Sequence, residues 1–108
     1  MPTMTDIRPV LAELQEALQR LYGERLKRVI LYGSWARGEA DAGSDVDVMV
    51  VLQGPLQPGR EIDRTLDLLV DIGLKHRTLI SVYPVTEEDY EATQSPVLIN
   101  ARREGVVV

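Results

Sequence analysis

Apolar residues near the start of the chain recur at helical spacing. The pattern continues to Leu21, with Gly23 placed to end it, and it predicts a helix that buries one stripe. Thr5 or Asp6 stands where a helix-capping side chain is expected. The apolar positions of this stripe are Ile7, Val10, Leu11, Leu14, Leu18 and Leu21.

A second helical pattern covers about residues 60–75 and is amphipathic. We expect one side to pack against a core and the other to face solvent. The expected core side consists of Ile62, Leu66, Leu69, Val70 and Gly73. The expected solvent side consists mostly of Arg60, Asp63, Arg64, Asp67 and Asp71.

Three segments have the composition of strands, and a fourth is short. They are residues 29–32, Val46–Leu52 and 78–85, followed by the apolar tail 106–108. The pairs Gly54-Pro55 and Pro58-Gly59 predict a turn after the second strand.

Capping residues mark the shorter helices. Ser34 is placed to cap a brief helix that ends near Gly38. Thr86 begins an acidic segment with capping-box spacing, and Ser95-Pro96 opens a last helix that Gly105 should end. Helices therefore alternate with strands, without a repeat or a linker. We expect a single α/β (α+β) domain over residues 1–108, and the pattern leaves the strand order open.

Composition narrows the functional classes. The chain has 108 residues, of which 44% are hydrophobic, and this is enough for one modest core. It has no Cys, which excludes disulfides and thiolate zinc sites, and it shows neither a signal peptide nor a long apolar run. We therefore expect a cytoplasmic protein without a membrane segment. The net charge of -5 argues against extended nucleic-acid binding.

The chemistry is concentrated in residues 33–47. Asp45 and Asp47 are two residues apart, so on a strand they point to the same face about 6.5 Å apart, while Val46 and Val48 face the core. Two carboxylates at that distance repel by roughly 2–3 kcal/mol at an effective dielectric near 20. A divalent cation removes this repulsion, and oxygen ligands suit Mg²⁺.

Gly33 and Ser34 supply the complementary part of a phosphate site. A glycine at a strand-to-helix turn lets the backbone approach a phosphate, and the first N–H groups of the helix are free to donate to it. Arg37 lies a few residues further on and could reach phosphate oxygens, although a surface ion pair is equally compatible. Trp35 could stack on a base, but covering the sheet edge is the favoured role.

Each part of this stretch also has a purely structural interpretation. An isolated Asp-x-Asp is usually a solvated loop end, and an isolated Gly-Ser is usually a turn and a cap. Their combination, in the order strand, turn, helix, loop, strand, favours a binding site.

The stretch resembles the signature of the DNA polymerase beta nucleotidyltransferase superfamily, in which Gly-Ser is followed after ten residues by Asp-x-Asp. Gly33-Ser34 and Asp45-Val46-Asp47 match it in full. Within that superfamily the chain is similar to minimal nucleotidyltransferases, and segments such as 80–82 and 103–105 extend the similarity over nearly the whole chain. The resemblance implies a small mixed sheet flanked by helices. It also implies Mg²⁺-dependent transfer of a nucleoside monophosphate to a hydroxyl, with ATP the favoured nucleotide, and pairing with a helical HEPN-domain toxin.

One feature departs from this pattern. Active members carry a third carboxylate on a later strand, and residues 78–85 contain no acid. Ser81 stands near the expected place, and three acids, Glu87, Glu88 and Asp89, lie beyond the strand.

Two main interpretations follow. The chain is a nucleotidyltransferase in which Asp45 and Asp47 are catalytic and bind the metal, while Gly33, Ser34 and Arg37 bind the nucleotide. Alternatively, it is a catalytically impaired nucleotide-binding module that neutralises a HEPN-type toxin by covering it. A third interpretation, a chance match in a structural domain, predicts no metal-dependent nucleotide binding.

Overall fold

The computed structural model describes residues 7–41 and 43–108. Its helices are α1 (Arg8–Tyr22), the 3₁₀ turn η2 (Gly23–Arg25), α2 (Ser34–Arg37), α3 (Pro58–His76), α4 (Glu87–Ala92) and α5 (Pro96–Glu104). Its strands are β1 (Leu26–Tyr32), β2 (Val46–Leu52), β3 (Ile80–Thr86) and β4 (Val106–Val107). None of the described helices is long and apolar enough to cross a membrane.

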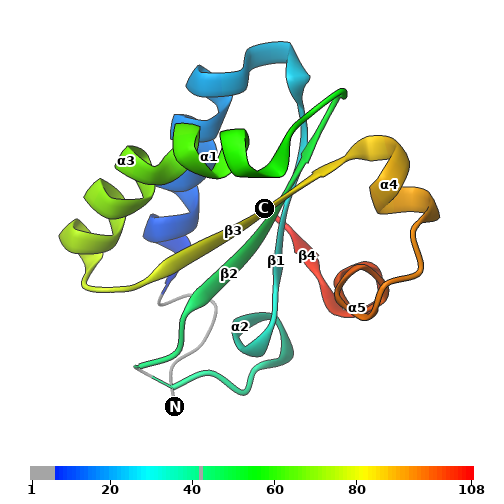
Figure 1. Ribbon diagram of the computed structural model, residues 1–108. Coiled ribbons are helices and arrows are strands. Elements are labelled where there is room, and N and C mark those ends of the chain that lie inside the picture. Colours follow the sequence, from blue (N-terminus) through cyan, green and yellow to red (C-terminus); the bar gives the residue numbers. More distant parts are fainter. Residues whose placement is uncertain (1–6, 42) are drawn as a thin grey trace.

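The strands form one mixed sheet in the order β3-β2-β1-β4. Strand β1 is antiparallel to both β2 and β4, whereas β2 and β3 are parallel. Helices α1 and α3 lie on one side of the sheet, and α4 and α5 lie on the other, as Figure 1 shows. The predicted α/β fold with a small mixed sheet flanked by helices is confirmed.

Strand β2 is the centre of both hydrophobic cores. Val46, Val48, Val50 and Leu52 belong to the core under α1 and α3. The alternate residues Met49 and Val51 belong to the core under α4 and α5. All six side chains are completely buried, so Asp47 is the one polar residue of an otherwise apolar strand. The bounds predicted for this strand and the inward direction of Val46 and Val48 are confirmed.

Helix α1 follows the prediction except at its ends. The helix begins at Arg8, and the expected caps Thr5 and Asp6 lie outside the described residues. Leu21 was expected in the buried stripe, but it is 41% exposed. Tyr22, four residues after Leu18, is buried in its place and donates its hydroxyl to Glu61 Oε1 at 3.0 Å.

The face that α3 buries differs in part from the prediction. Gly73 is buried and the predicted solvent side is exposed, as expected. Ile62, Leu66 and Val70 were assigned to the core, but their side chains are exposed. Glu61 and Thr65 are buried instead, because Glu61 accepts the Tyr22 hydrogen bond and the Thr65 hydroxyl donates to the Glu61 carbonyl at 3.0 Å. Polar side chains satisfied in this way turn the helix by about one residue from the orientation that hydropathy predicts.

Helix α3 and strands β1 and β3 begin at residues other than those predicted. The turn predicted at Pro58-Gly59 is wrong, because Pro58 begins α3, where a proline needs no hydrogen-bond partner. Strand β1 begins at Leu26, three residues earlier than predicted, and β3 begins at Ile80, two residues later.

The predicted caps of the last two helices are confirmed. Thr86 accepts a hydrogen bond from Asp89 N at 3.0 Å, and Ser95 accepts one from Leu98 N at 3.4 Å. Ser34, by contrast, does not cap α2: Gly33 is the N-cap residue, and no side chain caps this helix. The tail forms β4, in which Val106 pairs with Leu31.

Candidate functional site

The candidate site lies where β1 ends beside the start of β2. Tyr32 is opposite Asp47 in the antiparallel pair, so Gly33 leaves β1 directly next to the Asp47 carboxylate. A Cβ atom at Gly33 would lie 2.6 Å from Asp47 Oδ2. The backbone angles of Gly33, φ 78° and ψ -155°, belong to a region that is essentially restricted to glycine. Both the close approach and the backbone conformation therefore require glycine at this position.

Helix α2 is fixed against the loop that precedes Asp45. Trp35 is buried, and its Nε1 donates to the Ser44 carbonyl at 3.3 Å. The Glu39 amide donates to the Ser34 carbonyl at 2.9 Å, and Gly38 ends the helix in the left-handed conformation. Trp35 thus has the packing role that the sequence favoured.

Side-chain hydrogen bonds connect described residues of the loop between α2 and β2. Asp41 Oδ1 accepts a hydrogen bond from Gly43 N at 2.9 Å, and the Asp41 amide donates to Ser44 Oγ at 3.0 Å. Directly after Asp45, the Val46 amide donates to the Leu79 carbonyl at 2.8 Å. Asp45 is therefore held between a closed turn and the first hydrogen bond to β3, with its side chain exposed.

Burial raises the pKa of the Asp47 carboxyl above its ordinary value of 3.8, the negative charge of Asp45 raises it further, and Arg37 partly offsets both effects. The folded state consequently binds this proton more tightly than the unfolded state. The free energy of unfolding of the metal-free chain should then fall as pH rises from 3.8 through the raised folded-state pKa. A cation bound between the two carboxylates would remove this cost, so the donor set fits a divalent metal. Among the described residues no group of three or more acids, histidines or cysteines converges on this pair.

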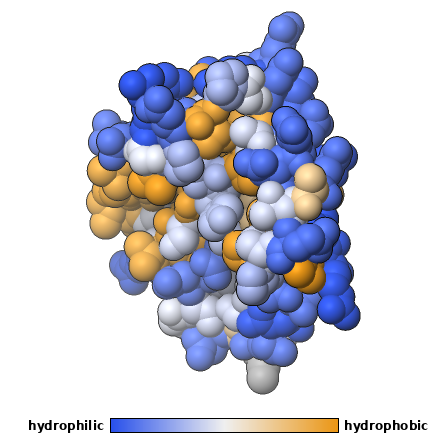
Figure 2. Space-filling view, turned by 45° about the vertical axis from the view of Figure 1, so that its right-hand side comes forward, coloured by the Kyte–Doolittle hydropathy of each residue, from blue (hydrophilic) through white to orange (hydrophobic). Residues whose placement is uncertain are grey.

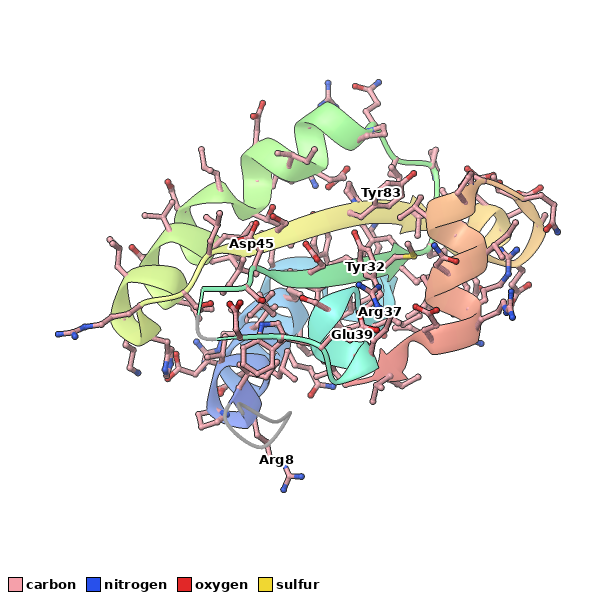
Figure 3. The ribbon with its side chains drawn as sticks, turned by 90° about the horizontal axis from the view of Figure 1, so that it is seen from below. Arg8, Tyr32, Arg37, Glu39, Asp45 and Tyr83 are labelled. Atoms are coloured by element: carbon pink, nitrogen blue, oxygen red, sulfur yellow. The ribbon has the colours of Figure 1, made fainter. Side chains whose placement is uncertain are left out.

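Arg37 lies near the carboxylates, but it is engaged by two other acids. Its Nε is 2.9 Å from Glu39 Oε2, and its Nη1 is 3.6 Å from Glu104 Oε2. Figure 3 shows Arg37 on α2 together with Glu39. The side chains of Arg37, Glu39 and Glu104 are 38%, 64% and 42% exposed. The structure therefore places Arg37 at the site in a surface ion-pair cluster, which a phosphate would have to displace.

The strand register shows which side chains lie beside Asp47. Ser81 is its partner on β3, so the position expected for a third carboxylate holds a serine. Thr86 pairs with Leu52, five residues further along β2, or about 16 Å away. The acids Glu87, Glu88 and Asp89 follow Thr86, and this distance excludes them from the site as alternatives to Ser81.

The sequence interpretation missed two tyrosines at this site. Tyr32 is opposite Asp47, and Tyr83 is one step beyond Ser81 on the same face of β3. Burial raises the pKa of Tyr32 to about 12, with smaller contributions from the charges of Asp47 and Tyr83. Both side chains therefore lie on the face of the sheet that carries Asp47, and Figure 3 labels both. Their positions in the sequence, directly before Gly33 and two residues after Ser81, were the available signal.

Gly33→Ala should destabilise the fold more than the same change at Gly38. Both glycines have positive φ, but a Cβ at Gly38 meets nothing within 4 Å. We expect a loss of about 3 kcal/mol for Gly33→Ala and about 1 kcal/mol for Gly38→Ala. Urea denaturation of both variants measures the difference. Equal losses would contradict the contact between Gly33 and Asp47.

Comparisons with known proteins agree with this geometry. The family described as "Nucleotidyltransferase domain" matches residues 11–97. A Methanocaldococcus jannaschii protein named "Putative protein adenylyltransferase MJ0604" is 34% identical over 70% of both chains. A second protein of the same name and organism, MJ0141, is 32% identical over 70% of this chain and 76% of its own length.

Solved structures show the same fold at lower identity. A nucleotidyltransferase structure from Sulfolobus solfataricus, itself assigned only by inference, has a TM-score of 0.69 and 18% identity and covers 96% of this chain and 82% of its own. One chain from the structure of the tri-AMPylated Shewanella oneidensis HEPN toxin in complex with MNT antitoxin has a TM-score of 0.52 and 14% identity. The match covers 91% of the present chain and 70% of that chain. The family match and the identity to its relatives establish that this chain belongs to the nucleotidyltransferase domain family.

Proposed function

We propose that this chain binds a nucleoside triphosphate, preferably ATP, together with Mg²⁺, and transfers the nucleoside monophosphate to a hydroxyl on a partner protein. The observation that carries the proposal is the packing of the Gly33 backbone against the Asp47 carboxylate, with Asp45 beside it, in a member of the nucleotidyltransferase domain family. This arrangement would place a phosphate between the backbone that follows Gly33 and the two carboxylates of Asp45 and Asp47. We further propose that residues 1–108 act as one domain in the cytoplasm, where the triphosphate is available.

The proposed roles follow from the chemistry of each group. Asp45 and Asp47 would hold Mg²⁺, which when bound neutralises charge on the carboxylates and the phosphates. The backbone after Gly33 and the Ser34 hydroxyl would donate hydrogen bonds to phosphate oxygens. Arg37 would exchange Glu39 and Glu104 for a phosphate. The acceptor oxygen would then bond to the α-phosphorus, pyrophosphate would leave, and the hydroxyl proton would pass to solvent.

We infer the acceptor and the partner protein from the names of the relatives and of one structural neighbour. Two relatives carry the name of protein adenylyltransferases, and one structural neighbour is a complex of an MNT antitoxin with an AMPylated HEPN toxin. We therefore propose a HEPN-type helical protein as the partner and an antitoxin role for this chain.

A second candidate function is supported by one observation. Ser81 occupies the β3 position beside Asp47, where a third acid that activates the acceptor hydroxyl was expected. Under this alternative the chain binds the nucleotide but neutralises its partner by covering it.

Triphosphate binding should require Mg²⁺ and both carboxylates. We expect Asp45→Asn or Asp47→Asn to weaken ATP binding by about tenfold or more, a loss of about 1.4 kcal/mol, because each removes a metal ligand without disturbing the fold. Titration calorimetry with each nucleoside triphosphate, with and without Mg²⁺, measures this. Asp71→Asn, an exposed acid on α3, is the matched control. Equal binding by the double Asn variant without Mg²⁺ would refute the site.

Ser81→Asp should increase transfer if Ser81 stands in the place of the third acid. We expect slow pyrophosphate release from ATP by the wild type and an increase of at least about 100-fold in the variant, since a positioned base contributes that much. Ser81→Asn tests the same shape without the charge and should give no increase. Vigorous release by the wild type would show that another group activates the acceptor.

Modification of the partner should require Asp45 and Asp47, whereas neutralisation by covering the partner should not. When the chain is co-expressed with a HEPN-type protein encoded beside it, modification should add the mass of a nucleoside monophosphate to that protein. Asp45→Asn with Asp47→Asn should abolish the added mass, whereas co-purification should survive if covering suffices. Intact mass spectrometry of the purified complex distinguishes the two. If no such protein is encoded there or co-purifies, the antitoxin role is rejected and the nucleotide site stands.

A further inference from the structure

Helix α3 exposes a continuous row of large apolar side chains. Ile62, Leu66, Val70 and Leu74 are 46%, 53%, 47% and 75% exposed and follow one another at four-residue intervals. These four residues are called the α3 stripe below. From Ile62 to Leu74 the stripe advances by 12 residue steps, or about 18 Å of helix. The buried residues of α3 are Glu61, Thr65, Ile72 and Gly73, on the neighbouring side of the helix, and none of them belongs to the stripe.

The stripe continues into a groove at the sheet edge. A cavity of about 510 Å³ lies between α3 and the beginning of β3. Strand β3 has no neighbour on its outer side among the described strands, so the groove opens beyond the sheet. Figure 2 shows apolar side chains gathered on the left of the molecule, the side where Figure 1 places α3 and the start of β3. The lining residues are mainly apolar and include Leu66, Leu69, Val70, Leu74, Leu79 and Ile80.

The groove adjoins the candidate functional site without overlapping it. Leu79 is 63% exposed, and its carbonyl accepts the hydrogen bond from Val46, the residue after Asp45. Ile80 packs into the core under α1 and α3, whereas Ser81 points to the face that carries Asp47. A protein seated in the groove would therefore lie next to the Asp45 end of the site.

An acidic row accompanies the stripe. Asp63, Asp67 and Asp71 each directly follow a stripe residue and are exposed. Within the part of the chain that the structure describes, none of the three forms an ion pair. The nearby Arg64 is directed to Glu61, at 3.7 Å. A contact surface that covers the stripe would thus meet unneutralised negative charge along one flank.

This charge pattern selects among the possible occupants. In a symmetric antiparallel pair of α3 helices, the same flank of each copy meets across the seam, and the two acidic rows would repel. An antiparallel pairing with a second copy of the chain is therefore disfavoured. A small molecule is also a poor match, because the stripe extends beyond the groove and the polar lining is limited to groups such as Arg77 and Thr78.

We propose that the α3 stripe and its groove dock an amphipathic helix of a partner protein, with an apolar ridge flanked by Lys or Arg. Ridge residues enter the groove beside Leu79, and the basic flank pairs with Asp63, Asp67 and Asp71. The surface is independent of the nucleotide chemistry. It rests on the proposed function only for the expectation that the partner is a helical HEPN-type protein.

The test uses a designed helical peptide of about 18 residues, or about 27 Å, with a Leu/Ile ridge flanked by Lys. A control peptide keeps the ridge and replaces each Lys by Glu. We expect fluorescence anisotropy to show binding of the Lys peptide that is at least about tenfold tighter, or about 1.4 kcal/mol, than that of the Glu peptide. Added salt should reduce the difference, because the charges are exposed.

Variants of the chain locate the binding surface. Leu66→Asp with Val70→Asp should abolish binding, and Asp63→Lys with Asp67→Lys should reverse the preference to the Glu peptide. Leu21→Asp on α1, an apolar residue of similar exposure, should bind as the wild type does. All variants should unfold in urea as cooperatively as the wild type, which reports folding, and Mg²⁺-dependent ATP binding by the same variants tests the proposed function separately.

Three outcomes would overturn the docking surface. The first is equal affinity for both peptides, and the second is unchanged binding by the stripe variants. The third is a wild-type dimer in analytical ultracentrifugation that the stripe variants convert to a monomer, which would assign the surface to a second copy.

Discussion

The close approach of Gly33 to Asp47 is the constraint on which the rest of the site depends. Because Tyr32 is opposite Asp47, the chain must turn away from the sheet within one residue, and only glycine has both the backbone angles and the space to do so. Helix α2 begins immediately after this turn. The buried Trp35 then ties α2 to the Ser44 carbonyl, so the same turn that exposes the backbone beside Asp47 also fixes the loop that presents Asp45.

Strand β2 explains how the fold tolerates an unfavourable site. Its apolar residues pack into the cores on both faces of the sheet, which anchors the strand independently of its acidic end. Asp47 can therefore remain half-buried beside Asp45 with a raised pKa, although the pair lowers the stability of the metal-free protein at neutral pH. Two like charges that destabilise the fold but are held on a well-packed strand are expected at a functional site, here one that would bind a cation.

The sequence predicted the features that depend on residues close together in the chain, such as side-chain alternation along a strand and helix caps. The alternation of Val46, Asp47 and Val48 was sufficient to place the carboxylate away from the α1/α3 core, and Thr86 and Ser95 cap helices as their positions indicated. The orientation of α3 was not predictable, because Glu61 is buried by a hydrogen bond from Tyr22, 39 residues earlier. Tyr32 and Tyr83 were not assigned to the site for a similar reason. Their proximity to Asp47 depends on the register between strands, and that register is set by packing rather than by any short motif.

Strand β3, at the edge of the sheet, borders both the candidate functional site and the groove beside the α3 stripe. Ser81 and Tyr83 border the Asp47 face of this strand, while Leu79 lies at its beginning in the groove against α3. No described strand covers the outer side of β3, so this edge of the sheet is open next to the groove. Under the proposed function, a partner docked on the α3 stripe would close that side. The nucleotide would be held by elements within the chain, and the acceptor would be positioned by an interface, so selectivity for the acceptor would depend on the fit of the partner to α3 rather than on further residues around Asp47.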